Sequence, residues 1–303
     1  MTDVDSSRAL GNVVIPTDFS EGAQLALQRA VRLPLRRGAA LRLLHVMPVT
    51  LDAALAERIN ADVQRRLGDA REELLGLAAT AGQTEREVSV AIGHGKPFVE
   101  IVRRARHGRA ELIVVGRHGE RTFRELVIGS TAERVIRKGD VSVLVVANPA
   151  TEPYRKPLVA VDLSDSSRLA LELALRLCDP AIERIDVVHV VELPIGHAVG
   201  AATAFGLEPL RQEKEAHART ELAAMLGRLG GPARWNLIVK TGDPRQVILE
   251  EAKARGADLV ALGTRGRTGL AHVLVGSVAE AVVRGATSDV LVARLPRTDF
   301  SLP

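Results

Sequence analysis

Aromatic and sulfur-containing side chains are scarce in this 303-residue chain, and their scarcity excludes several kinds of site. Aromatic residues make up 2% of the sequence, too few for the stacking platforms of single-strand nucleic-acid binders or for an aromatic-sandwiched flavin. The single cysteine, Cys178, excludes an intramolecular disulfide and any cysteine-rich zinc or iron–sulfur site. Its apolar, helical surroundings predict an inert core residue.

The net charge is also small, and the uncharged stretches are short. The formal net charge is +4, which is too weak a field to indicate a nucleic-acid-binding protein. The first ten residues are polar and contain acids, unlike a secretory signal. The longest uncharged stretch, Leu193–Leu207, is too short and too interrupted to span a bilayer. We expect it to form a surface loop before a helix near Glu208–Leu229, in a cytoplasmic protein that binds neither nucleic acid nor membrane.

The sequence repeats itself once, which predicts two domains of similar fold. Val13–Ser20 aligns with Leu158–Ser164 at an offset of 144 residues, and the glycine motifs further along align at an offset of 147. Hydrophobic residues make up 46% of the chain, so each half can bury a core of its own. We expect domains at residues 1–148 and 158–303, joined by a proline-containing linker at residues 149–157.

Apolar runs alternate with helical patterns in each half. Runs such as Leu112–Val115 contain no polar alternation, as in strands that are buried on both faces of a parallel sheet. This order predicts an α/β fold of two tandem, doubly wound, Rossmann-like parallel-sheet domains with strand order 3-2-1-4-5. The expected strands of the first half are Val13–Thr17, Ala40–Val46, Glu87–Ile92, Leu112–Val115 and Ser142–Ala147, and the helices lie near Glu21–Arg36, Ala54–Ala79, Lys96–Arg106 and Thr131–Lys138.

A glycine-rich segment follows the predicted fourth strand of each half. The pattern Gly-x2-Gly-x9-Gly-Ser covers Gly116–Ser130 and recurs over Gly263–Ser277. Glycine permits a positive φ and lets the backbone approach a ligand closely, and the helix start after the third glycine offers unpaired N–H groups to an anion. Because ligands of doubly wound sheets bind beyond the carboxyl ends of the strands, we expect an anion site here.

An aspartate follows the predicted first strand of each half and would face the glycine-rich segment. Asp18 and Asp162 supply an acceptor that suits a ribose hydroxyl or a hydrated Mg²⁺. Aspartate, glycines and a basic loop together predict a nucleotide site in each half. The arginines expected to add positive charge near the phosphates are Arg117, Arg121, Arg124, Arg265 and Arg267.

Each part of this pattern also has an interpretation without a ligand. Ser130–Glu133 and Ser277–Glu280 both fit a capping box, in which the serine starts its helix. Asp18 and Asp162 could likewise be helix-start residues. His45 and its counterpart His189 close apolar strands and are best explained as hydrogen-bonded structural histidines. Turns alone explain less well why the whole pattern occurs twice at the same spacing.

These motifs resemble those of the universal stress protein family, in particular its tandem members. The similarity covers nearly the whole chain, and the Gly-x2-Gly-x9-Gly-Ser spacing is typical of the ATP-binding branch. The resemblance implies an adenine nucleotide alpha hydrolase-like fold and ATP, AMP or ADP as ligand, with Mg²⁺ as a candidate companion. It also implies that the domains pair through their last strands, Ser142–Ala147 with Ser288–Ala293.

The resemblance further assigns residues to parts of the nucleotide and implies no metal ligand or catalytic residue. Val161 stands where the first half has Thr17, which could alter adenine packing in the second half. In the first half, the residues for adenine and ribose are Pro16, Thr17, Asp18 and Val46, and those for ribose and phosphates are Gly116, His118, Gly119, Gly129, Ser130 and Thr131. The matching residues of the second half are Val161, Asp162, Val190, Gly263, Arg265, Gly266, Gly276, Ser277 and Val278.

The expected function is an ATP-binding stress protein that senses or buffers adenine nucleotide, with one site per domain. A slow ATPase is an alternative, but the sequence offers no convincing general base, since Arg265 stands where the first loop has His118. A nucleotide-independent interaction protein is a further alternative, against which the intact spacing argues. Further association of the chain into a homodimer is left open.

Overall fold

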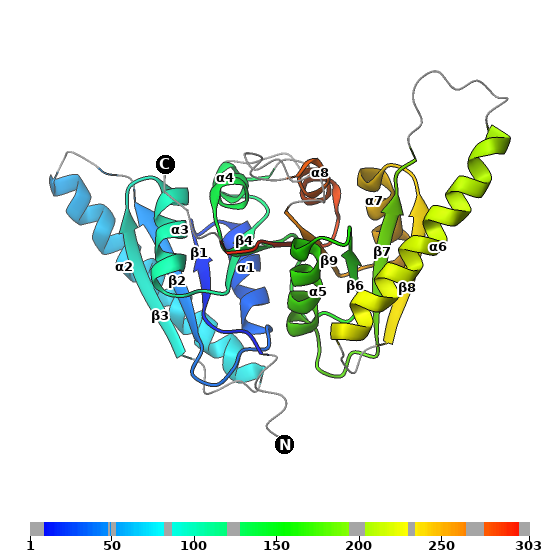
Figure 1. Ribbon diagram of the computed structural model, residues 1–303. Coiled ribbons are helices and arrows are strands. Elements are labelled where there is room, and N and C mark those ends of the chain that lie inside the picture. The colour runs from blue at the N-terminus through cyan, green and yellow to red at the C-terminus, as the bar shows by residue number, and fades with distance from the viewer. Residues whose placement is uncertain are drawn as a thin grey trace.

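The computed structural model describes residues 9–47, 49, 53–81, 87–119, 128–193, 204–229, 234–264 and 276–296. These residues form one ten-stranded sheet with helices on both faces (Figure 1). The first half contains β1 (Val13–Pro16), α1 (Glu21–Val31), β2 (Ala40–Met47), α2 (Ala53–Thr80), β3 (Glu87–His94), α3 (Pro97–His107), β4 (Leu112–Gly116), α4 (Ser130–Lys138) and β5 (Ser142–Val146). The second half contains β6 (Pro157–Ala160), α5 (Asp165–Leu177), β7 (Arg184–Val191), α6 (Ala204–Leu229), β8 (Arg234–Thr241), α7 (Pro244–Arg255), β9 (Leu259–Gly263), α8 (Ser277–Gly285) and β10 (Asp289–Ala293).

The strand order confirms the predicted topology in both halves. The sheet runs β3-β2-β1-β4-β5-β10-β9-β6-β7-β8, which is 3-2-1-4-5 followed by the same order in reverse. All pairs within a half are parallel. The carboxyl ends of the strands therefore lie along one edge in each half, where the predicted ligand residues gather.

Two helix boundaries differ from the prediction by more than one residue. α1 ends at Val31 rather than at Arg36, because Pro34 disfavours the helical conformation in the residue before it. α6 begins at Ala204, so the last residues of the predicted loop Leu193–Leu207 are helical. None of the helices in the described segments is long and apolar enough to cross a bilayer.

The hydrophobic core forms two layers, one on each face of the sheet, and both layers run through both halves. Successive residues of a strand pack on opposite faces of the sheet, so Val13 and Ile15 lie in one layer and Val14 lies in the other. One layer packs beneath α1, α2, α5 and α6, and the other beneath α3, α4, α7 and α8. The two halves thus share their core across the joint between them.

The joint is an antiparallel pairing of β5 with β10, as the sequence analysis predicts. Leu144 lies opposite Leu291, and both strands are fully buried. The pairing covers two strand edges that would otherwise expose unpaired backbone groups. At one end of the joint the Ala147 N–H donates to Asp289 Oδ1 (2.9 Å), and at the equivalent place the Arg294 N–H donates to Ser142 Oγ (3.1 Å).

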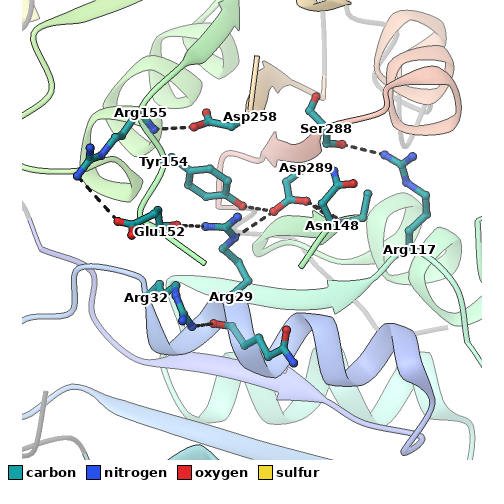
Figure 2. A network of polar contacts seen from close by, with 12 residues as sticks. Arg29, Arg32, Arg117, Asn148, Glu152, Tyr154, Arg155, Asp258, Ser288 and Asp289 are labelled. Atoms are coloured by element: carbon teal, nitrogen blue, oxygen red, sulfur yellow. Dashed lines mark hydrogen bonds and ion pairs between the residues drawn. The ribbon is translucent and has the colours of Figure 1, made fainter. Parts of the chain in front are cut away.

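A buried polar network closes one end of the joint (Figure 2). Asp289 is 1% exposed and accepts from Arg29 Nε at 3.1 Å and from the Tyr154 hydroxyl at 2.5 Å. The Arg29 guanidinium also lies 3.9 Å from the centroid of the Tyr154 ring. Asp289 belongs to β10, Arg29 to α1 and Tyr154 to the segment between the halves. The network therefore links these three parts of the chain.

Candidate functional site

The turn between β1 and α1 is built around Asp18. Its Oδ1 accepts from the Ser20 N–H (3.1 Å) and the Ser20 hydroxyl (2.5 Å), and Ser20 Oγ in turn accepts from the Ala23 N–H (3.2 Å). Ser20 is therefore the N-cap of α1, and the interpretation of Asp18 as the helix-start residue is wrong. Phe19, between them, has a φ of +62°, which is costly for a bulky residue.

The second half repeats this turn bond for bond. Asp162 Oδ1 accepts from the Ser164 N–H (3.1 Å) and hydroxyl (2.5 Å), and Ser164 Oγ accepts from the Ser167 N–H (3.2 Å). Leu163 has a φ of +67°, matching Phe19. Two unrelated side chains hold the same strained conformation, so the turn, and with it the aspartate's orientation, is fixed by the backbone and the serine.

The two histidines are structural, as expected. His45 Nδ1 lies 2.8 Å from the Thr17 carbonyl oxygen, and His189 Nδ1 lies 2.7 Å from that of Val161. Each histidine thereby ties the end of the second strand of its half to the turn that carries the aspartate.

An aromatic cluster distinguishes the first half from the second. The Phe19 ring stacks on His45 with centroids 4.7 Å apart, and the Arg66 guanidinium lies 4.2 Å from the Phe19 centroid. The second half has Leu163 in place of Phe19. Sequence reasoning missed this cluster, although the phenylalanine-to-leucine difference at the aligned turns was its visible signal.

The glycines that end β4 and β9 allow these strands to approach α1 and α5 closely. A Cβ on Gly116 would lie 2.1 Å from the Gly22 carbonyl oxygen, and one on Gly22 would lie 1.9 Å from that of His118. In the second half, a Cβ on Gly263 would lie 2.4 Å from Ser166 Oγ. Gly22 was not singled out from the sequence, because its role depends on backbone almost a hundred residues away.

The expected positive φ at Gly116 and Gly119 is wrong, because neither residue adopts one. What both positions require is space, since side chains would collide with backbone or carboxylate. A Cβ on Gly119 would lie 2.6 Å from Asp18 Oδ2. The structure therefore brings the aspartate and the glycine-rich segment of the first half together.

The start of α4 completes this assembly. The Gly129 N–H donates to the Arg117 carbonyl (2.8 Å), and a Cβ on Gly129 would lie 3.4 Å from the Gly119 nitrogen. We call Asp18, Gly119, Gly129 and the first turn of α4 the first cradle. We call the equivalent residues of the second half, Asp162, Gly276 and the first turn of α8, the second cradle; here the Gly276 N–H donates to the Thr264 carbonyl (2.8 Å).

The capping-box interpretation of both cradles is wrong. Gly129 and Gly276 are the N-caps, so Ser130 and Ser277 come one position too late to cap. Neither cap makes a side-chain hydrogen bond within the described part of the chain. By contrast, Ser20 and Ser164 cap their helices with side-chain oxygens. Among the residues that the structure describes, no side chain caps the first N–H groups of α4 and α8, an arrangement that suits an anion site.

Arg117 does not face the first cradle. Its side chain is buried, and the guanidinium donates to the carbonyl oxygen of Ala286 in the second half. It also donates to the carbonyl oxygen of Ser288 at 2.9 Å (Figure 2). Burial lowers the pKa of this guanidinium, while the charge of Asp289 raises it. Arg117 was expected to add positive charge near the phosphates, and the structure instead directs its guanidinium to the backbone of the second half. Arg121, Arg124, Arg265, Gly266 and Arg267 lie outside the described residues.

The other predicted residues lie at the same edge of the sheet. Pro16 ends β1, and Thr17 and Val161 immediately follow β1 and β6. Val46 and Val190 each stand one residue before the end of their strand, and Thr131 and Val278 are the second residues of α4 and α8. No group of three His, Cys, Asp or Glu side chains in the described segments could hold a metal ion.

Comparisons with known proteins agree with this architecture. The sequence profile of the universal stress protein family matches residues 10–147 and again residues 153–294. A universal stress protein of Mycolicibacterium smegmatis is 27% identical over 301 residues, covering 93% of this chain and 96% of that protein. Universal stress protein A homolog 2 of Coxiella burnetii is 34% identical over 145 residues, covering 47% of this chain and 96% of its own.

A solved structure shares the fold of the whole chain. The universal stress protein of Archaeoglobus fulgidus superposes with a TM-score of 0.65 at 20% identity, covering 93% of this chain and 98% of that one. The repeated sheet order, the duplicated aspartate turns and the two family matches lead to one conclusion. The chain belongs to the universal stress protein family, with two family domains of adenine nucleotide alpha hydrolase-like fold in tandem.

Proposed function

We propose that the chain binds an adenine nucleotide in each half, with ATP as the leading candidate, and acts as a nucleotide sensor or buffer in a stress response. The observation that supports this most is the first cradle. There, an uncapped helix start and an ordered carboxylate flank a glycine whose Cβ position is 2.6 Å from that carboxylate. The second half repeats the aspartate turn and the uncapped helix.

Different residues would contact the phosphates, the ribose and the adenine. The N–H groups at the start of α4 would receive phosphate oxygens, aided by the positive end of the helix dipole. Asp18 would accept from a ribose hydroxyl, because its Oδ1 is already fixed by Ser20. The adenine would lie toward Thr17 and Val46, at the ends of the first two strands. Mg²⁺ would enter with the phosphates, whose oxygens are its preferred ligands.

Binding is favoured over hydrolysis by the position of Arg117. Phosphoryl transfer requires positive charge at the transferred group, beyond a cradle of backbone N–H groups. The Arg117 guanidinium is committed to carbonyl oxygens of the second half and so does not supply that charge. A slow ATPase remains the second candidate function. Phosphate release above that of a variant carrying both Gly129→Val and Gly276→Val would support it.

Calorimetric titration of ATP into nucleotide-free protein tests the proposal. We expect two binding events in the wild type, one in Gly129→Val or Gly276→Val, and none in the double variant, because a branched side chain at either N-cap enters its cradle. Gly68→Ala, on an exposed face of α2 with nothing within 4 Å, is the matched control. Thermal unfolding would verify that each variant folds. Absence of binding in the wild type, or unchanged binding in the double variant, would refute the proposal.

A further inference from the structure

Two buried arginines reach across the joint between the halves. Arg117 donates to the carbonyl oxygens of Ala286 and Ser288, just beyond α8. Arg294 donates to the carbonyl oxygens of Gly139 and, at 2.8 Å, Ile136, at the end of α4. Each guanidinium therefore meets the carboxyl-terminal end of the last helix of the other half, where the helix dipole favours a cation.

The two arginines occupy different positions of the repeat. At the offset of 147 residues, Arg117 aligns with Thr264 and Arg294 aligns with Ala147. The Arg117 backbone is bonded to the first cradle, since its carbonyl accepts the Gly129 N–H at 2.8 Å, and its own N–H donates to the Val146 carbonyl at 2.8 Å. Arg294 follows β10 and lies outside both cradles.

We infer that Arg117 is a positioning residue for the first cradle: its side chain, held by the second half, fixes the carbonyl that holds Gly129 and the start of α4. The ligand-binding consequence rests on the proposed function, whereas the positioning itself does not. In the second half, Thr264 holds Gly276 through the same backbone bond without an arginine at that place. The first cradle therefore depends on the joint through Arg117, and the second cradle does not depend on an equivalent residue.

The chemistry of a buried guanidinium makes this anchor rigid. A buried charge is stable only while it is hydrogen-bonded, so Arg117 cannot leave its carbonyl partners without a large desolvation penalty. Its Nε has no hydrogen-bond partner among the described residues, which leaves the two terminal nitrogens to hold it. A lysine would present a single ammonium group and could not reproduce this fork.

Arg117→Met, Arg117→Lys and Arg294→Met test the inference, with the last as the matched control at similar burial in the same joint. Hydrogen exchange in nucleotide-free protein gives the first readout. We expect Arg117→Met to speed exchange of the Gly129 amide by about tenfold, the loss of roughly one net hydrogen bond. Arg117→Lys should be intermediate. Exchange of Gly276 should be unchanged, and Arg294→Met should leave Gly129 unchanged.

ATP titration in a Gly276→Val background gives the second readout. Arg117→Met should weaken binding at the first cradle by about tenfold, and Arg294→Met should leave it unchanged. Equal effects of the two methionine variants, or an unchanged Gly129 exchange rate in Arg117→Met, would overturn the inference. If Arg117→Met does not fold, Arg117→Lys is compared with Arg294→Lys by the same criteria. Lack of ATP binding in the wild type would refute the proposed function, while the exchange data would still decide the positioning role.

Discussion

At the scale of single residues, glycines, which have no side chain, shape the site more than charged residues do. The start of α1 and the end of β4 touch backbone to backbone through Gly22 and Gly116, and this contact brings the aspartate turn next to the glycine-rich segment. The strained φ of Phe19 and Leu163 belongs to the same construction, since each lies beside an aspartate that the turn must orient.

Substitution of Gly116 therefore should act on stability first. Gly116→Ala would place a Cβ 2.1 Å from the Gly22 carbonyl oxygen, so backbone must move, and we expect the free energy of unfolding to fall by about 2 kcal/mol. Gly68→Ala, in open space on α2, should instead raise it by about 0.5–1 kcal/mol. Urea unfolding measures both values. A Gly116→Ala variant as stable as the wild type would show that this close approach is not needed.

At the scale of elements, strands and helices could be predicted from the sequence because buried parallel strands read as unbroken apolar runs. The end of α1 could not, because the apolar pattern continues past Val31 and only Pro34 marks the break. The capping-box motif failed for a related reason: spacing alone does not distinguish an N-cap residue from the first helical one. The direction of Arg117 was not predictable at all, since its partner carbonyls lie 169 and 171 residues further along.

The uncapped start of α4 gives a prediction that separates stability from binding. Gly129→Asp supplies a carboxylate that can accept from the Thr131 or Ala132 N–H, so we expect stability to rise by about 0.5 kcal/mol. The same carboxylate would occupy the first cradle and repel phosphate, so ATP binding there should be lost. Gly129→Asn caps without charge and separates occupancy from repulsion. Wild-type affinity in Gly129→Asp, measured by calorimetry, would mean that phosphate does not bind at this helix start.

At the scale of the whole molecule, the two ends of the β5–β10 joint carry different side chains, although the two halves repeat the same fold. Pairing of the last strands follows from the family resemblance, and the structure confirms it. The charged network at one end does not follow from it, because Ser142 stands where the second half has Asp289. Asp289 gathers Arg29 and Tyr154 in the interior, so loss of that carboxylate would leave a buried guanidinium without its counter-charge.

Tyr154 offers a direct measurement of this joint, because it is the single tyrosine of the chain. Burial, followed by the charge of Asp289, raises the pKa of its hydroxyl well above the usual value of 10.0. The unfolded chain then releases the tyrosine proton at a pH where the folded chain keeps it. The free energy of unfolding should therefore be unaffected by Tyr154 below pH about 10 and fall above it, by up to about 1.4 kcal/mol per pH unit.

Cys178 adds a second contribution of the same sign, since burial also raises the pKa of its thiol well above 9.0. The comparison of wild type with Tyr154→Phe isolates the tyrosine, because both proteins keep the cysteine. Urea unfolding at a series of pH values should give a steeper decline in the wild type, starting near the ordinary tyrosine pKa. Near-ultraviolet absorbance should show tyrosinate appearing together with unfolding. If tyrosinate formed in the folded protein at its ordinary pKa, Tyr154 would be open to water and the joint would not be sealed.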